Sequence, residues 1–320
     1  MSRSTKIWLI VAASLVALGI IIFGVVMSVL EWDFVKLSTA KYESNSYETD
    51  ESFHNISIDT DTADITFLPS DDGKCNVVCY EREKEKHEVT VQNDTLVINK
   101  TNNKKWYDNI GINFETTKIT VYLPESEYGS LTIKESTGAV EIPENFRFKS
   151  IDIIASTGDI KNAASVSDSL KIKTSTGKIN ISGISAGAVD LSVTTGNIEA
   201  YDIKCEGDVK IKVSTGKTKL TNVECKNIIS EGDTGSISLN NVISSEKIFI
   251  ERDTGDVKFD SCDAKEIYVE TDTGDVKGSL LSEKVFIVQT DTGNKDVPKT
   301  TSGGICEITT DTGDIIISIK

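Results

Sequence analysis

Residues 247–259 read KIFIERDTGDVKF, with apolar residues alternating on both sides of a Thr-Gly dipeptide. The dipeptide recurs through the second half of the chain at a nearly constant interval. A fixed period of roughly 20 residues predicts a solenoid, in which each repeat is one coil that buries its apolar face against its neighbours. The glycines of the ten dipeptides are Gly138, Gly158, Gly177, Gly196, Gly216, Gly235, Gly255, Gly274, Gly293 and Gly313.

Each repeat is predicted to form two strands that meet at the Thr-Gly corner. With the glycine numbered zero, positions −7, −5 and +2 are apolar in nearly all repeats. A period of two is typical of strands, and glycine accepts the positive φ that suits a corner. The threonine at −1 shares the parity of −7 and −5, so we expect a buried threonine ladder. The fold class is therefore predicted as all-β, a parallel β-solenoid (β-helix) of about 19–20 residues per coil.

The regular solenoid is predicted to span residues 131–320, with less regular sequence before it. Residues 56–67 show the apolar alternation of the repeats once more, with Ala63 in place of the corner glycine. We expect residues 53–130 to form irregular N-terminal coils that cap the solenoid. Residues 31–52 are polar and acidic, and are predicted to be an extracytoplasmic tether. The C-terminal residues 315–320 have no evident cap, which predicts an open edge for strand addition.

Residues 7–30 are predicted to be a transmembrane anchor. The segment is uncharged and mostly apolar throughout. At about 1.5 Å per residue it spans roughly 36 Å, which is enough to cross a bilayer. Arg3 and Lys6 precede it, so the positive-inside rule places residues 1–6 in the cytoplasm and the rest of the chain outside. A cleaved signal peptide is the alternative, but its apolar region is usually about 7–15 residues and ends in small residues. We interpret the segment as an uncleaved, single-pass anchor in the cell membrane.

The charge of the chain bears on its partners. The net charge is −16, and residues 1–30 hold two basic and no acidic groups, so residues 31–320 carry −18. This balance argues against nucleic acid or an anionic membrane surface as a partner. It suits a rod outside the cell that attracts cations or basic partners, although an acidic surface is also simply well solvated.

Six cysteines lie in a context where disulfides are permitted. Cys75 and Cys79 are four positions apart in an alternating run and, on one strand, are too far apart to bridge. Cys205 and Cys225 each follow a repeat glycine by nine positions, so they are expected on adjacent coils. Two interpretations stay open for this pair: a buried ladder of thiols, which we favour, or one disulfide between coils.

The residue at position −2 changes halfway along the repeats. It is Ser or Thr in the first five corners and Asp in the last five, namely Asp233, Asp253, Asp272, Asp291 and Asp311. Asp-Thr-Gly-Ser at 233–236 also reads as the active-site tetrapeptide of aspartic proteases, but a corner that recurs with the coil explains all five triplets. We expect these carboxylates to bond their own turns, and keep a calcium ladder as the alternative. No other cofactor is predicted.

Catalytic side chains are sparse, so we predict that the protein is not an enzyme. The two histidines, His54 and His87, fall outside the regular repeats, and His87 lies in a charged run expected to be a solvated loop. Polysaccharide cleavage by carboxylates is the remaining catalytic class. Trp106 and Tyr107 form the best candidate for an exposed aromatic contact site. The alternative is that these two side chains pack their loop against the N-terminal cap.

Three stretches carry a family resemblance: IDTDTADI at 58–65, ITVYLP at 119–124, and the Ser-Thr-Gly-Asp-Ile and Asp-Thr-Gly-Asp-Val corners. On these the chain resembles the bacterial β-strand-repeat "putative adhesin" domain of unknown function, which includes membrane-anchored LiaG-like envelope proteins. The likeness covers about residues 50–320. It implies a surface-exposed β-solenoid, often linked to adhesion or envelope stress, and brings no established catalytic residues.

The predicted function is that of a membrane-anchored, extracytoplasmic β-solenoid. It would act as a cell-surface binding, adhesin-like or structural envelope module, with a cell-wall polymer or a surface or membrane protein as its partner. One alternative is a sensory or regulatory ectodomain in an envelope-stress system. The other is a polysaccharide-active β-helix enzyme.

Overall fold

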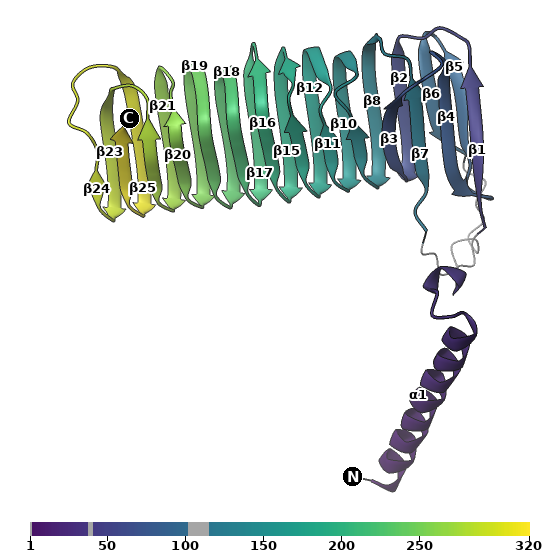
Figure 1. Cartoon of the computed structure of the whole chain (residues 1–320). Helices are drawn as coiled ribbons and strands as arrows, with labels where there is room; N and C mark the ends of the chain where they lie inside the picture. Colours follow the sequence, from purple (N-terminus) through teal and green to yellow (C-terminus); the bar gives the residue numbers. More distant parts are fainter. Residues whose placement is uncertain (1, 38–40, 102–114) are drawn as a thin grey trace.

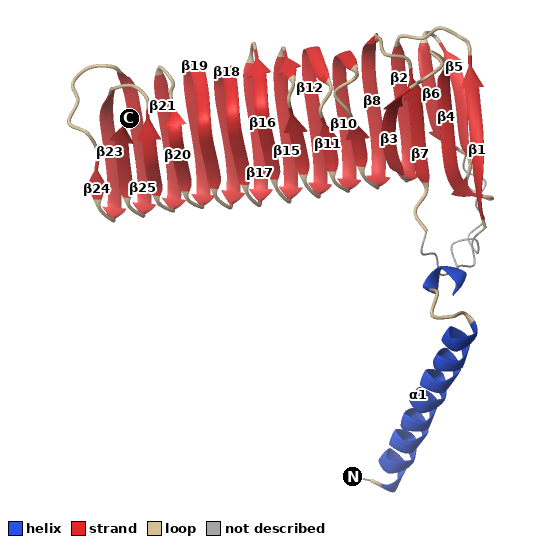
Figure 2. Ribbon diagram, in the orientation of Figure 1, coloured by secondary structure: helices blue, strands red, loops and turns tan. Residues whose placement is uncertain are grey.

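The computed structural model describes residues 2–37, 41–101 and 115–320. Its strands form two long ladders that are joined at the corners and enclose one hydrophobic core, as the repeat predicted (Figures 1 and 2). In each regular coil the strand before the glycine lies in the first ladder and the strand after it lies in the second. All the pairings among the regular coils are parallel. The fold is therefore the predicted parallel β-solenoid.

The bounds of the elements follow this alternation. The first ladder holds, in spatial order, β5 (His87–Gln92), β6 (Thr95–Lys100), β2 (Asn55–Thr62), β8 (Glu127–Thr137), β10 (Arg147–Thr157), β12 (Ser165–Thr176), β15 (Ala188–Thr195), β17 (Asp208–Thr215), the later parts of β18 (Thr218–Thr234) and β19 (Ile237–Thr254), β21 (Glu266–Thr273), β25 (Gly304–Thr312) and β23 (Lys284–Thr292). The second holds β1 (Tyr42–Thr49), β4 (Cys75–Arg82), β7 (Lys118–Leu123), β3 (Asp64–Pro69), β9 (Val140–Ile142), β11 (Ile160–Asn162), β13 (Ile179–Ser182), β16 (Ile198–Cys205), the earlier parts of β18 and β19, β20 (Val257–Cys262), β22 (Val276–Leu280), β26 (Ile315–Ile319) and β24 (Lys295–Asp296). The short β14 (Ser185–Ala186) pairs with the end of β16.

The corner glycines are required by close stacking of the coils. Gly158 has φ 149°, and a Cβ there would lie 1.6 Å from the carbonyl oxygen of Gly138. Gly196 and Gly216 meet the carbonyl of the preceding corner glycine in the same way, at 1.8 and 1.7 Å. Any side chain at these positions would push adjacent coils apart. The Thr-Gly period is thus a column of backbone contacts along one edge of the solenoid.

The expected inward threonine ladder is wrong. All ten threonines at position −1 are exposed, and the last inward position before the glycine is −3, occupied for example by Ala155, Thr174 and Val193. The chain already turns outward at −2, so both residues before the glycine lie outside the core. The corners therefore display threonine at −1, beside Ser, Thr or Asp at −2, to solvent.

The proximal end of the solenoid is closed by antiparallel strands. β5 pairs antiparallel with β6, and β1 pairs antiparallel with β4. β1 comprises residues 42–49, which the sequence assigned to the tether over residues 31–52, so the folded body begins earlier than expected. These antiparallel additions change the direction of the strands at the edge, which ends the parallel stack.

At the distal end the coils are not stacked in the order in which they occur in the sequence. β25 and β26 lie between the coil of Gly274 and the coil of Gly293, because β25 pairs with both β21 and β23 (Figure 1). Gly274 N donates to Thr312 O, and Gly313 N donates to Thr292 O, both at 2.9 Å. The expected open edge at residues 315–320 is therefore wrong at Ile315 and Ile316, which pair with β24. In the described structure Ile317–Ile319 pair with a strand on the β22 side alone. The distal edge is β23 and β24, where Lys295 replaces the apolar residue at +2 and is exposed, as suits an end coil.

One helix, α1 (Arg3–Val29), precedes the strands, followed by the short 3₁₀ helix η1 (Phe34–Leu37). By length and composition α1 could cross a membrane: it has 27 residues, and the mean hydropathy of its most apolar window is 2.9, with none of that window buried. In Figure 1 it lies apart from the ladders, below their proximal end.

Candidate functional site

The return corner, opposite the Thr-Gly corner, carries a column of small side chains. Strand register places Ala186 beside Cys205, and Cys225 beside Ser244. The pairing of Lys204 with Glu224 puts the two cysteines on neighbouring coils, as their spacing predicted. These side chains are small, and at Cys205 and Cys225 the residues on either side are long and charged. The column therefore forms the floor of a groove that runs along the rod.

Two cavities follow this groove and meet at Ser245. One, of about 590 Å³, lies over the middle coils, and the other, of about 780 Å³, lies nearer the distal end. The first is lined by residues between Val166 and Ser245, and the second by residues between Ile243 and Ile305. Together they cross most of the regular coils. The groove can thus hold an extended chain rather than a compact molecule.

Charged residues of both signs form the walls of the groove. In the middle cavity these are Lys204, Glu206, Glu224 and Lys226, all of them exposed. Successive coils place a basic residue next to an acidic one, since Lys204 pairs in register with Glu224. The body of the protein is strongly acidic, but the walls of this cavity are balanced in charge. Such walls suit a ligand that carries both charges or many neutral polar groups.

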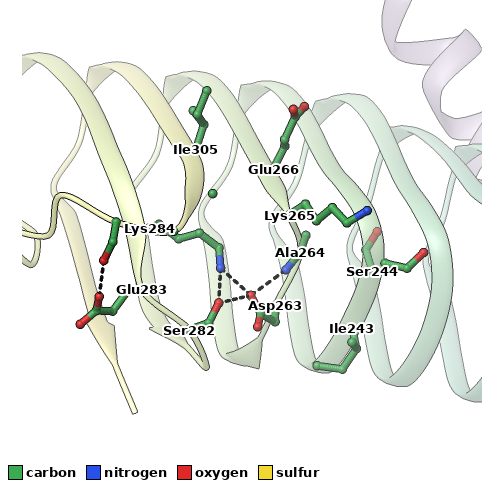
Figure 3. Close-up of a pocket in the computed structure, with 14 residues that line it drawn as sticks. Ile243, Ser244, Asp263, Ala264, Lys265, Glu266, Ser282, Glu283, Lys284 and Ile305 are labelled. Carbon is green, nitrogen blue, oxygen red and sulfur yellow. Dashed lines mark hydrogen bonds and ion pairs between the residues drawn. The ribbon is translucent and has the colours of Figure 1, made fainter.

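The distal cavity contains an ion pair between a buried lysine and a half-buried aspartate (Figure 3). Lys284 Nζ donates to Asp263 Oδ1 at 2.7 Å, and the Lys284 side chain is only 2 % exposed. The same oxygen accepts from Ser282 Oγ at 2.8 Å and from Ala264 N at 2.9 Å, while Lys284 also bonds Ser282. Lys284 lies on β23 opposite Gly304, so this ion pair spans the inserted coil. It fixes the last coil to the return corner before β21.

The six cysteines are free thiols and buried, which confirms the thiol-ladder interpretation over a disulfide between coils. Burial raises the pKa of Cys225 to about 12 and also raises the pKa of Cys205. A thiol with a raised pKa is a poor nucleophile, because the thiolate is the reactive form. The cysteines in the floor of the groove therefore serve packing rather than covalent chemistry.

The Asp column lies at the opposite corner from the groove. All five aspartates at −2 are exposed: Asp233, Asp253, Asp272, Asp291 and Asp311. Among the described residues, the one group of three candidate metal-ligand side chains with ligand atoms within 4.8 Å of one another is elsewhere, in the proximal cap. The column is thus a solvent-facing ladder and does not converge on one point.

The hydrogen bonds expected of the −2 aspartates are made instead by residues at +1. Asp159 Oδ1 accepts from Lys178 N at 2.8 Å on the next coil, and Asp64 accepts from Ala139 N at 2.9 Å. At the distal end Asp275 Oδ1 accepts from Asp314 N at 2.8 Å, and Asp314 accepts from Asn294 N at 3.0 Å. These bonds join coil to coil and follow the inserted order of the distal coils.

Two further predictions concern the aromatic pair Trp106 and Tyr107 and the histidine His87. Trp106 and Tyr107 lie outside the described residues. His87, expected in a solvated loop, is buried in the proximal cap, because its strand β5 turns the ring inward. The groove along the return corner was not predicted from the sequence. The signal that could have revealed it is the small residue that follows the corner glycine by about nine positions.

Comparisons with known proteins found one matching family and several similar solved structures. The family model Toastrack DUF4097 matches residues 53–212 and 201–320. A solved "putative adhesin" from Parabacteroides merdae has 12 % identity and a TM-score of 0.50, covering 76 % of this chain and 98 % of its own. A "putative adhesin" and a "putative lipid binding protein", both from Parabacteroides distasonis, have TM-scores of 0.47 and 0.44 at 10 % and 16 % identity, covering 85 % and 88 % of this chain and 98 % of their own. No curated protein matches the chain.

Proposed function

Because this chain belongs to the Toastrack DUF4097 family, whose β-solenoid it shares, we propose that it is a membrane-anchored module that binds an extended polymer of the cell surface. In this proposal α1 spans the cell membrane with residues 1–6 in the cytoplasm, and the solenoid lies outside. This arrangement follows from the basic residues Arg3 and Lys6 before the apolar segment and the acidic Glu31 and Asp33 after it.

The observation that carries the proposal is the groove along the return corner. It crosses successive coils at a repeat of about 4.8 Å, so equivalent side chains face a bound chain at regular steps. Lys204 and Lys226 present ammonium groups, and Glu206 and Glu224 present carboxylates, along the same path. A polymer that carries both charges, such as the peptide-bearing wall polymer of bacteria, matches this pattern. The role is binding, without turnover of the ligand.

The test is sedimentation of the full chain, in nanodiscs, with purified insoluble cell wall. The double variant Lys204→Glu/Lys226→Glu should bind about tenfold more weakly, a change of about 1.4 kcal/mol. The matched control is Lys173→Glu/Lys212→Glu, which makes the same change in net charge on exposed residues of the first ladder. The control should bind like the unmodified protein.

Three outcomes would count against the proposal. Equal weakening of both double variants would show that net charge, not the groove, governs binding. Recovery of membrane regulators alone after cross-linking in cells, with no retention by the wall, would favour a sensory ectodomain. Release of soluble wall fragments during the assay would point to the polysaccharide-active alternative.

A further inference from the structure

A second cluster of polar side chains lies in the proximal cap, far from the groove. Cys79 and Glu81 face the core from β4, and His87 faces it from β5. Cys79 and Glu81 are 0 % exposed and His87 is 6 % exposed. The thiol sulfur, a carboxylate oxygen and a ring nitrogen of these residues all lie within 4.8 Å of one another.

These three side chains are held in place by their neighbours. His87 Nδ1 lies 2.7 Å from Glu81 Oε2, which also accepts from His87 N at 2.7 Å. Asn45 Nδ2 donates to Glu81 Oε1 at 2.8 Å. On the other side of the ring, His87 Nε2 lies 2.9 Å from Thr60 Oγ1 on β2. Metal-binding histidines and carboxylates are commonly oriented by such outer contacts.

The chemistry of the set favours a transition metal over calcium or magnesium. One imidazole, one thiol and one carboxylate are the ligand types that zinc takes, whereas calcium and magnesium take oxygen ligands. A divalent ion bound by one thiolate, one carboxylate and a neutral imidazole is balanced in charge. Balance matters here because an uncompensated charge is costly in a buried site.

From this geometry we propose that Cys79, Glu81 and His87 form a zinc site that fastens β4 to β5 in the proximal cap. His87 binds through Nδ1 and keeps its other proton on Nε2, which donates to Thr60. Cys79 binds as the thiolate, and its proton is released to solvent. The metal takes the place of the hydrogen bond between Glu81 and His87. Three protein ligands leave one position of a tetrahedral ion for water.

Other ionisable groups face the cluster. Tyr47 donates from its hydroxyl to His87 O at 3.0 Å, and its pKa is raised by burial and by the nearby Glu81 carboxylate. Glu43 shares the Asn45 amide with Glu81, and Glu135 lies beside Thr60 in the strand register. These groups meet the cluster through the His87 carbonyl, the Asn45 amide and the register partner of Thr60.

The test uses the full chain in detergent, stripped of metal by chelator and titrated with Co²⁺ and then Zn²⁺. Co²⁺ should produce the charge-transfer absorption of a cobalt–thiolate bond, and Zn²⁺ should remove it. Cys79→Ser should abolish the band. Cys75→Ser is the matched control, since Cys75 is also buried on β4 and faces the same way, and it should leave the band unchanged. Thr60→Val, which keeps all three ligands, should weaken zinc affinity by about 10–100-fold.

Absence of the band in the unmodified protein, or its equal loss in both cysteine variants, would overturn the proposal. Should Cys79→Ser fail to fold, Cys205→Ser/Cys225→Ser decides between the two places where thiols gather. A band that persists in this double variant supports the cap site. A band that disappears assigns the metal to the floor of the groove and rejects the cap site.

Discussion

At the scale of single residues, the exceptions to the repeat carry most of the information. Glu135 occupies the inward position −3 of the first regular coil, where other coils have residues such as alanine, threonine or valine. It is buried, and both carboxylate oxygens lack a hydrogen-bond partner among the described residues. Burial, with a contribution from Asp64, raises the pKa of Glu135 to about 7.

This raised pKa makes stability depend on pH. Between an unfolded pKa of about 4.5 and a folded pKa of about 7, the native state holds more protons than the unfolded chain. Stability should therefore fall as pH rises through this window, by up to about 3 kcal/mol. Glu135→Gln removes the charge and should raise the melting temperature at pH 8 but not at pH 4.5. The exposed Glu141→Gln is the control, and an equal response of both variants would contradict the prediction.

A second exception is a buried guanidinium. Arg252 is 3 % exposed, and its Nη2 donates to Ser230 Oγ at 2.8 Å. A Cβ on Gly232 would lie 1.8 Å from Arg252 Nη1, and Thr218 Oγ1 lies 3.4 Å from Nη2. The sequence breaks its apolar pattern at Ser230, Gly232 and Thr218 because all three surround this one side chain. Burial lowers the pKa of Arg252 to about 10, so it stays charged at neutral pH.

A buried charge is costly, and the nearby Asp233 carboxylate offsets only part of the cost for Arg252, so replacing Arg252 with an apolar group should stabilise the fold. Arg252→Met with Ser230→Val should raise the free energy of unfolding by about 1–4 kcal/mol. Ser230→Val alone should lower it, because the guanidinium then loses its 2.8 Å acceptor and meets added bulk. Thermal melts of the three proteins check the signs. A stabilised single variant would show that Arg252 does not depend on Ser230.

At the scale of elements, the carboxylates at +1 accept hydrogen bonds from the backbone of neighbouring corners. Asp159→Ala removes the 2.8 Å acceptor of Lys178 N and should cost about 1 kcal/mol. Asp253→Ala, at the exposed −2 position, should change stability by less than about 0.5 kcal/mol, with or without calcium. Chemical unfolding in calcium and in chelator measures both. A calcium-dependent loss in the Asp253 variant would restore the cation ladder.

The elements also show which parts of the fold can be predicted from the sequence. The Thr-Gly period, with apolar alternation on both sides of each dipeptide, determines strands, corners and parallel stacking, because these depend on contacts that every coil repeats. It does not reveal that −1 faces solvent, since parity cannot show where a strand starts to turn. The sequence also did not reveal that His87 is buried. The charged run at 81–88 contains two inward residues, Glu81 on β4 and His87 on β5, and these strands take their positions from antiparallel pairing with β7 and β6.

At the scale of the whole molecule, the inserted C-terminal coil locks the distal end. Three features depend on it: β25 pairs with strands on both sides, Lys284 reaches across it to Asp263, and Asp314 caps Asn294 N. Interaction with the Asn294 amide and with Lys277 lowers the pKa of Asp314. That contribution to stability is present above the ordinary carboxyl pKa and is lost as pH falls through the lowered value. The distal end should therefore lose stability in acid, which hydrogen exchange in β23 at low pH would measure.

Removing residues 304–320 should release the end coil without unfolding the rod. β23 and β24 have an exposed Lys295 at an inward position and lose their only strand partners in the described structure, β25 and β26. Because each coil contacts only its neighbours, the loss should not propagate to distant coils. Hydrogen exchange should show lost protection in β23 and near-native protection in β10 and β12. Retained protection in β23 would mean that it restacks on β21 in sequence order, and lost protection throughout would mean that the inserted coil supports the entire solenoid.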